Sequence, residues 1–222
     1  MAEISINILH AKHILLVDND TVLGNNLATN YAATIKRLGG NIAETEKINA
    51  KSSDFNGVIA KIKDSNIDLI LFAGVVPQSP AFAVRLRQLG LTTPLLLSGG
   101  AVNVDFPYKT GEYPEGTLVV VPGKPVEQVL DFKRLEKMYR EKYSAPLRPQ
   151  TWMAYDAVQL LAEAMRQTNS LNPRMLSPVL HQIKYKGLSG NISFAADGSL
   201  ENPRYTLYRA EQGTWKTLNS AP

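Results

Sequence analysis

Short apolar runs alternate with segments of helical periodicity over the first 122 residues. Runs of four or five mostly apolar residues are typical of strands buried on both faces of a parallel sheet. The predicted strands are residues 13–17, 41–48, 68–72, 94–97 and 117–121. Between them, apolar residues recur every three or four positions, which predicts helices over about 21–38, 54–63 and 80–89.

This order predicts an α/β fold with a five-stranded parallel, flavodoxin-like sheet and helices on both faces, because the crossovers between parallel strands are right-handed. Residues 68–103 form the central βαβ unit and end in Ser98-Gly99-Gly100. Open sheets of this kind hold their ligands at the carboxyl ends of the strands. Ahead of the sheet, the alternation of Ile4, Ile6 and Ile8 favours another strand, with weak flanking signals.

After Pro122 the pattern becomes mainly helical, over residues 126–143, 150–167 and about 173–184. The helix at 150–167 is apolar nearly all round, so it should have packing partners on more than one side. Turn signals then separate short strands near 191–194 and 205–209.

Composition excludes several classes of protein. The chain has 222 residues, a net charge of +4 and no cysteine, which excludes disulfides and thiolate metal sites. Its cations are dispersed, and the densest group, at 133–142, interleaves carboxylates at helical spacing, so nucleic acid is not an expected partner. No run is long enough to span a membrane, and the start lacks the features of a signal peptide. Both a cytoplasmic protein and one whose export signal has been removed remain open.

Catalytic chemistry is not expected. The three histidines are scattered, and none has a carboxylate at metal-binding spacing. The segment Gly111–Thr117 has the glycine spacing of a phosphate loop, but it lacks the lysine and the strand-to-helix context. We therefore predict a protein without enzymatic activity, metal or cofactor.

One resemblance is to response-regulator receiver domains. Asp18 and Asp20 follow the first strand, Ser98 follows the fourth and Lys124-Pro125 follows the fifth, as in that family. The position of the phospho-accepting aspartate is, however, occupied by Ala73. The alternative function that this resemblance implies is a non-catalytic pseudo-receiver, sensor or interaction module.

A second resemblance extends over residues 13 to about 215. The chain resembles the carboxyl-terminal portion of a type I periplasmic binding protein of the leucine/isoleucine/valine-binding family, which serves ABC importers. The segments that carry the resemblance are Asp20–Gly24, Ser53–Ile70, Gly74, Tyr113–Thr117, Ala154–Val158 and Tyr185–Phe194, followed by Asp197-Gly198, Pro203 and Tyr205.

The resemblance implies a periplasmic solute-binding protein with two lobes that close on a small-molecule ligand, and an ABC permease as partner. Residues 12–122 and about 190–222 would form the second lobe, and 123–189 would belong to a truncated first lobe. Truncation would leave the helix at 150–167 unpaired, so we expect its apolar face to be buried by rearranged packing or by a second copy of the chain.

The resemblance also places the ligand. Its site would include Asp20, Thr21, Leu23, Val75, Ser98 and Gly99. Members of the family that bind amino acids have aromatic or acidic residues at the positions of Leu23, Val75 and Gly99, so the usual counter-charge for an ammonium is missing here. Asp18 or Asp20 would substitute, although helix capping is the role that we favour for both. An amino acid held in the family's usual way is therefore disfavoured, and the replacements suit a ligand without a cation, such as a small carboxylate, or no ligand at all; an amino-acid-like ligand held in another way remains open.

Overall fold

The computed structural model describes residues 1–49, 51–74, 78–98, 115–129, 131–145, 147 and 149–221. The chain divides into two compact units. Unit 1 comprises Met1–Val121 and Leu207–Asn219, and unit 2 comprises Pro122–Thr206 and Ser220–Pro222. None of the helices in the described ranges combines the length and the apolar character needed to cross a membrane.

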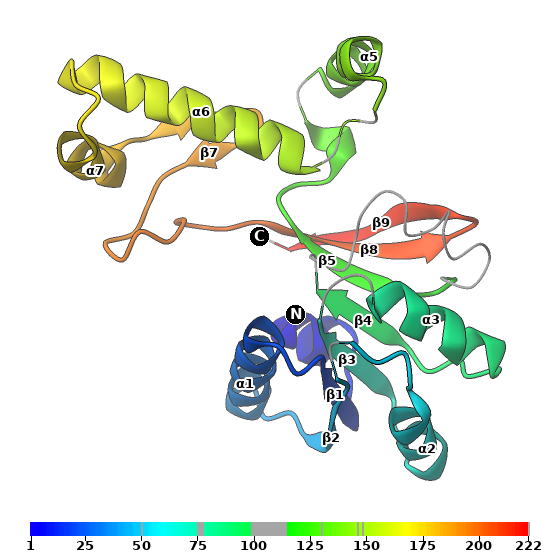
Figure 1. Cartoon of the computed structure of the whole chain (residues 1–222). Coiled ribbons are helices and arrows are strands. Elements are labelled where there is room, and N and C mark those ends of the chain that lie inside the picture. Colours follow the sequence, from blue (N-terminus) through cyan, green and yellow to red (C-terminus); the bar gives the residue numbers. More distant parts are fainter. Residues whose placement is uncertain are drawn as a thin grey trace. The chain divides into compact units, whose positions relative to one another are not determined.

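The predicted parallel strands are all present (Figure 1). They are β1 (Ile14–Asp18), β2 (Ile42–Lys47), β3 (Leu69–Ala73), β4 (Leu95–Ser98) and β5 (Leu118–Pro122). Two later strands, β8 (Tyr205–Glu211) and β9 (Thr214–Ala221), extend the sheet, and its order is β2-β1-β3-β4-β5-β8-β9. The α/β fold with a mostly parallel sheet is therefore confirmed, and it is wider than the sequence predicts.

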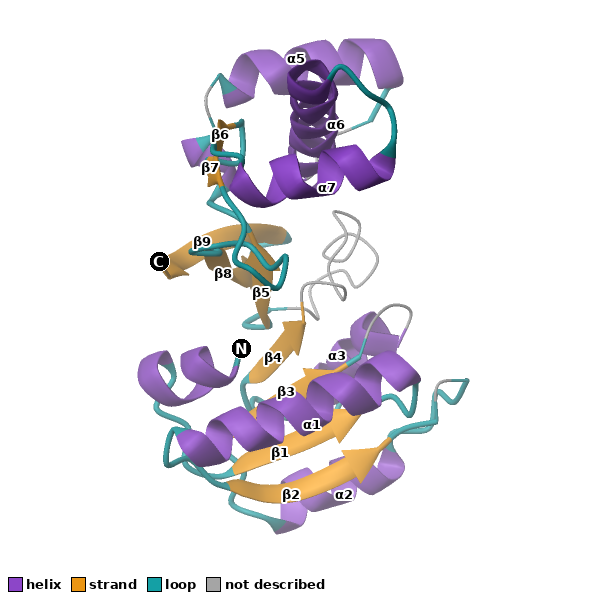
Figure 2. Ribbon diagram, turned by 90° about the vertical axis from the view of Figure 1, so that its left-hand side faces the viewer, coloured by secondary structure: helices purple, strands orange, loops and turns teal. Residues whose placement is uncertain are grey.

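Helices cover both faces of the sheet (Figure 2). The helices are α1 (Val22–Arg37) on one face and α2 (Asn56–Asp64) and α3 (Gln78–Gln88) on the other. Alternate residues of the strands enter the two cores: Leu71 packs in the cluster that includes Ile35 of α1, and Phe72 packs in the cluster that includes Phe82 of α3. This double coverage explains why β1, β3 and β4 are buried along their whole length.

The expected strand near the start of the chain is wrong. Residues Ile4–Ile8 form a π-helix, in which the Leu9 amide donates to the carbonyl oxygen of Ile4 at 2.8 Å. Buried Ala2 and Ile4 join the same core as α1. The apolar pattern of this segment is compatible with both the period of a strand and the period of a helix. Packing beside α1 selects the helix.

Two local features go beyond what the sequence predicts. Phe55 occupies the N-cap position of α2 and makes no side-chain capping bond, but the Asp54 carboxylate accepts from the amide of Asn56, the first residue of the helix, at 2.9 Å. The second feature is strand β9, whose mostly polar sequence did not identify it as a strand. It pairs with β8 through a two-residue turn at Gln212-Gly213, where both residues have positive φ (51° and 72°), the conformation that tight hairpins require.

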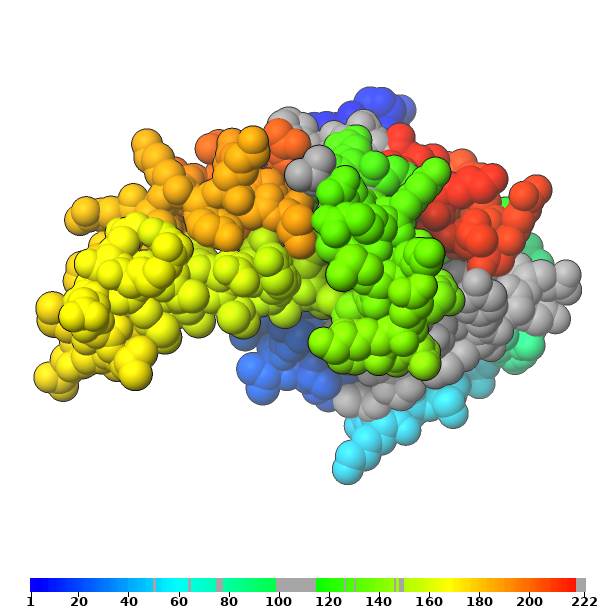
Figure 3. Space-filling view, turned by 90° about the horizontal axis from the view of Figure 1, so that it is seen from above, coloured from blue at the N-terminus to red at the C-terminus, as the bar shows by residue number. Residues whose placement is uncertain are grey.

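Unit 2 contains the predicted helices, with α5 at Phe132–Tyr143, α6 at Pro149–Thr168 and α7 at Pro173–Gln182. The short strands β6 (Tyr185–Lys186) and β7 (Asn191–Ile192) pair antiparallel. In Figure 3 the yellow surface of α6 and α7 lies alongside the orange surface of the segment that follows. On α5, exposed ion pairs such as Arg140–Glu136 (3.3 Å) confirm the predicted solvated helix.

A polar contact in unit 2 holds the loop after β6 against α6. The carboxylate of Asp156, which is 1% exposed, accepts hydrogen bonds from the Leu188 amide (2.8 Å) and the Ser189 amide (2.7 Å). The Ser189 hydroxyl donates to the same carboxylate. A buried carboxylate is tolerated here because these three donors replace water.

The chain passes between the units after Val121, after Thr206 and again after Asn219, and the first two crossings are adjacent. At the unit 2 side of these two adjacent crossings, the Gly123 amide donates to the Arg204 carbonyl oxygen at 2.7 Å, and the Thr206 hydroxyl donates to the Gly123 carbonyl oxygen at 2.7 Å. The two crossing segments are therefore joined by hydrogen bonds to each other.

Candidate functional site

Three strand ends come together in unit 1, at the edge where a ligand site is expected. The parallel register pairs Asp18 of β1 with Ala73 of β3, and it pairs Phe72 of β3 with Leu97 of β4. Ser98, the last residue of β4, follows Leu97 directly, just as Ala73 follows Phe72. Because the ends of parallel strands align in this way, the residues that follow each strand collect at a single edge.

The turn from β1 into α1 is held by its own polar groups. The carboxylate of Asp18 accepts from the Asp20 amide at 2.8 Å, and the Thr21 hydroxyl donates to the Asn19 side-chain oxygen at 2.7 Å. The same Thr21 oxygen accepts from the Gly24 amide at 3.0 Å and caps α1. The capping role that we favoured for Asp18 and Asp20 is therefore wrong, and Thr21 performs it.

This correction changes the electrostatics of the edge. Asp18 is 2% exposed, and no cation pairs with it among the residues that the structure describes. Asp20 lies 3.6 Å from the ammonium of Lys47, in a pair that is exposed and therefore weak. Asp18 therefore has no cation partner among the described residues, whereas the charge of Asp20 is offset in part by Lys47.

A second set of contacts fixes the ends of β3 and β4. The buried hydroxyl of Ser98 donates to the Gly74 carbonyl oxygen at 2.8 Å. Gly24 packs tightly against this region, since a Cβ added there would lie 2.9 Å from the Ala73 carbonyl oxygen. The strand ends and the start of α1 are thus in close contact.

The first turn of α3 adds two buried polar residues that the sequence analysis missed. The Gln78 side chain donates to the carbonyl oxygens of Asn49 (2.7 Å) and Ser52 (3.0 Å), and so holds the loop after β2. The hydroxyl of Ser79 is fully buried and has no hydrogen-bond partner in the described part of the chain. An unpaired buried hydroxyl costs free energy, and no described residue offsets this cost for Ser79. Neither residue carries a motif that would identify it.

The predicted site residues fall into two groups. Asp20, Thr21, Leu23 and Ser98 all lie at the strand-end edge, where Leu23 is 53% exposed on the first turn of α1. Val75 and Gly99 lie outside the described residues. The site as a set thus stays a prediction.

The same edge does not have the groups of a phospho-accepting receiver. Ala73, at the acceptor position, is completely buried and has no chemistry to offer a phosphoryl group. Within the described ranges, no three His, Cys, Asp or Glu side chains gather as they would around a metal ion.

Comparison with known proteins identifies the class. The sequence profile of the family described as "Periplasmic binding protein" matches residues 5–214. The chain therefore belongs to this family, and the resemblance found in the sequence is confirmed.

Among individual proteins, the chain is 25% identical over 206 residues to the leucine-, isoleucine-, valine-, threonine- and alanine-binding protein of Pseudomonas aeruginosa, covering 93% of this chain and 55% of the relative. It is 26% identical to the Leu/Ile/Val-binding protein of Citrobacter freundii, covering 89% and 53%. The chain thus spans about half the length of the curated relatives it matches.

Solved structures share the fold. A leucine-binding protein from Thermotoga maritima superposes with a TM-score of 0.85 at 21% identity, over 99% of this chain and 63% of that one. A solute-binding protein from R. palustris in complex with benzoate gives a TM-score of 0.81 at 14% identity, over 97% and 60%.

Proposed function

We propose that this chain is part of the solute-binding component of an ABC importer of the branched-chain amino acid type. It would act in the periplasm and deliver a small solute to an ABC permease. The match of the family profile over residues 5–214 carries the proposal, because it includes both the strand-end edge and unit 2. The same match favours this function over a pseudo-receiver, because it extends over nearly the whole chain.

We assign the ligand site to Asp20, Thr21, Leu23, Val75, Ser98 and Gly99, and we favour an amino-acid-like ligand over a plain carboxylate. Two observations support this choice. Asp18 and Asp20 supply negative charge that capping does not use, and a buried ammonium needs such a counter-charge. The proton of the Ser98 hydroxyl is already donated to Gly74, so it is not free for a ligand carboxylate.

A matched pair of ligands tests the assignment. We expect leucine, at about a hundredfold excess over its Kd, to raise the melting temperature by about 5–10 °C. The analogue 4-methylpentanoate lacks the ammonium and should raise it much less. Differential scanning fluorimetry over amino acids and small carboxylates measures both, and no shift with any compound would contradict a ligand site in this chain.

The variant Asp20→Asn tests the charge. Asparagine tolerates the positive φ of 51° at this position, so the fold should be kept. The affinity for an amino acid should fall by about tenfold, because one counter-charge is lost. Asp197→Asn is the control, since Asp197 also accepts the backbone amide two residues further on (Ser199, 2.9 Å) but belongs to unit 2. Equal affinity in both variants would contradict a role for Asp20.

Unit 1 and unit 2 would correspond to the second lobe and to part of the first lobe of the longer relatives. Unit 2 by itself leaves an apolar face of α6 exposed, with Tyr155 at 53%, Val158 at 63% and Leu161 at 41%. We propose that a second copy of the chain covers this face, because a contiguous apolar patch favours association.

Oligomeric state tests this proposal. Light scattering of the 222-residue chain should show a dimer, and Val158→Glu should weaken the dimer by at least about tenfold, since it places a charge in an apolar interface. Asn169→Asp, just beyond the end of α6, adds the same charge on an exposed residue and should leave the dimer intact. A monomer at all concentrations would exclude the second copy.

A further inference from the structure

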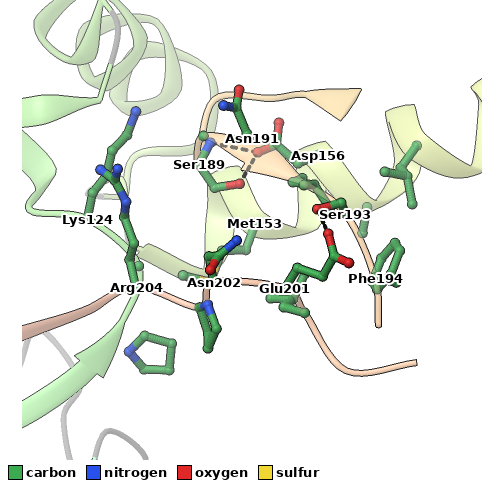
Figure 4. Close-up of a pocket in the computed structure, with 18 of the residues that line it drawn as sticks. Lys124, Met153, Asp156, Ser189, Asn191, Ser193, Phe194, Glu201, Asn202 and Arg204 are labelled. Atoms are coloured by element: carbon green, nitrogen blue, oxygen red, sulfur yellow. Dashed lines mark hydrogen bonds between the residues drawn. The ribbon is translucent and has the colours of Figure 1, made fainter. Parts of the chain in front are cut away.

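Unit 2 contains a hollow of about 860 Å³ between α6 and the segment from Ser189 to Tyr205 (Figure 4). Its volume lies within the range of roughly 300–1,000 Å³ that is usual for small-molecule sites. All of its lining residues belong to unit 2, and none of them lies at the strand-end edge of unit 1.

Two cations line one end of this hollow. Lys124 follows β5 and Arg204 precedes β8, and the backbone bond between Gly123 and Arg204 (2.7 Å) holds the two segments together. Figure 4 shows the two side chains next to each other. Neither cation forms an ion pair with any residue in the part of the chain that the structure describes.

The carboxylates of the hollow are occupied by other donors. Asp156 accepts from the amides of Leu188 and Ser189 and from the Ser189 hydroxyl. Glu201 accepts from the Ser193 hydroxyl at 2.7 Å. Two adjacent cations without a paired anion repel each other, and an anion between them would remove that repulsion.

Desolvation and the charge of Arg204 lower the pKa of Lys124, while the more weakly coupled Asp156 raises it. The environment of Lys124 therefore disfavours the charged form of its side chain. A bound anion would reverse this effect, which provides a direct readout of occupancy.

The remaining wall is apolar. Met153 and Leu160 of α6 form one side, and Ile192 and Phe194 of the following segment form another. A site with cations at one end and an apolar wall along its length matches a ligand that has a charged head and an apolar tail.

We propose that this hollow is a second ligand site, which binds a small organic anion with a carboxylate head group and an apolar tail. Lys124 and Arg204 hold the carboxylate, and the side chains of α6 contact the tail. The site does not depend on the ligand that unit 1 binds.

Octanoate is a suitable probe, and octanamide is its uncharged analogue. Isothermal titration of the whole chain should show saturable binding of one octanoate, with octanamide bound at least about tenfold more weakly. Lys124→Gln and Arg204→Gln should each weaken octanoate by about tenfold. The matched controls are Lys133→Gln on α5 and Arg174→Gln on α7, which remove exposed cations of the same unit and should leave the affinity unchanged.

Two further measurements distinguish this site from the strand-end edge of unit 1. Octanoate should raise the pKa of Lys124, followed by NMR of ¹³C-methylated lysines, and a saturating amino acid should not displace it. Equal affinity for octanamide, or unchanged affinity in both Lys124→Gln and Arg204→Gln with native circular dichroism, would overturn the proposal. Displacement of octanoate by the amino acid would also overturn it, because the probe would then occupy the strand-end edge.

Discussion

Replacing Asp156 with alanine is expected to lower the free energy of unfolding of unit 2 by about 3 kcal/mol, because it leaves three partly buried donors without an acceptor. These donors are the amides of Leu188 and Ser189 and the Ser189 hydroxyl. Asp156→Asn should cost less, since the amide oxygen still accepts one of them. The buried indole of Trp152, which is 2% exposed, reports the unfolding of this unit by fluorescence in a Trp215→Phe background.

Asp197 provides a matched control for this experiment. Its carboxylate accepts from the Ser199 amide (2.9 Å) and the Ser199 hydroxyl (2.6 Å), which is nearly the same set of donors. These bonds lower the pKa of Asp197, but the residue is exposed and water replaces the lost acceptor. Asp197→Ala should therefore have little effect. Similar losses of unfolding free energy in Asp156→Ala and Asp197→Ala would show that burial of the carboxylate does not determine the cost.

Replacing Gly24 with alanine should lower the free energy of unfolding of unit 1 by about 1–3 kcal/mol through overpacking. The new Cβ would lie 2.2 Å from the side-chain oxygen of Asn19 and 2.9 Å from the Ala73 carbonyl oxygen. Asn19 is buried and its oxygen already accepts from Thr21, so relief of the clash disturbs the turn that caps α1. Chemical denaturation followed at Trp215, which packs against the core of unit 1, measures the loss.

Gly57 is the control for Gly24. It also lies in the first turn of a helix, and nothing is within 4 Å of a Cβ added there. Gly57→Ala should raise the free energy of unfolding by up to about 1 kcal/mol, because alanine is the better helix former. If Gly24→Ala proved as stable as Gly57→Ala, the contact between α1 and the strand ends would be looser than the distances imply.

The central sheet was predictable because its strands are buried on both faces. Runs such as residues 69–73 contain no polar residue, and no other arrangement of these lengths satisfies them as well. The segment Ile4–Ile8 failed for the opposite reason, since its few apolar residues fit either period and only the packing beside α1 decides between them. The polar strand β9 could be inferred only from its turn and from its partner.

The candidate site was less predictable than the sheet. The sequence placed Asp20, Thr21 and Ser98 together at the strand-end edge, because parallel strands end together. It could not tell which of four adjacent polar residues caps α1, since Asp, Asn and Thr all serve in that position. Lys124 and Arg204 are eighty positions apart, and only the pairing of their backbone segments brings them together.

The two adjacent crossings between the units have a consequence for synthesis on the ribosome. Unit 1 is discontinuous, because Leu207–Asn219 completes its sheet only after all of Pro122–Thr206 has been made. Leu207 and Tyr208 belong to the two cores of unit 1, so neither core is complete until then. At roughly 5–20 residues per second, the ribosome needs several seconds to make the intervening segment. During that interval β5 is an exposed edge strand. It is then available to chaperones and prone to incorrect pairing with other strands.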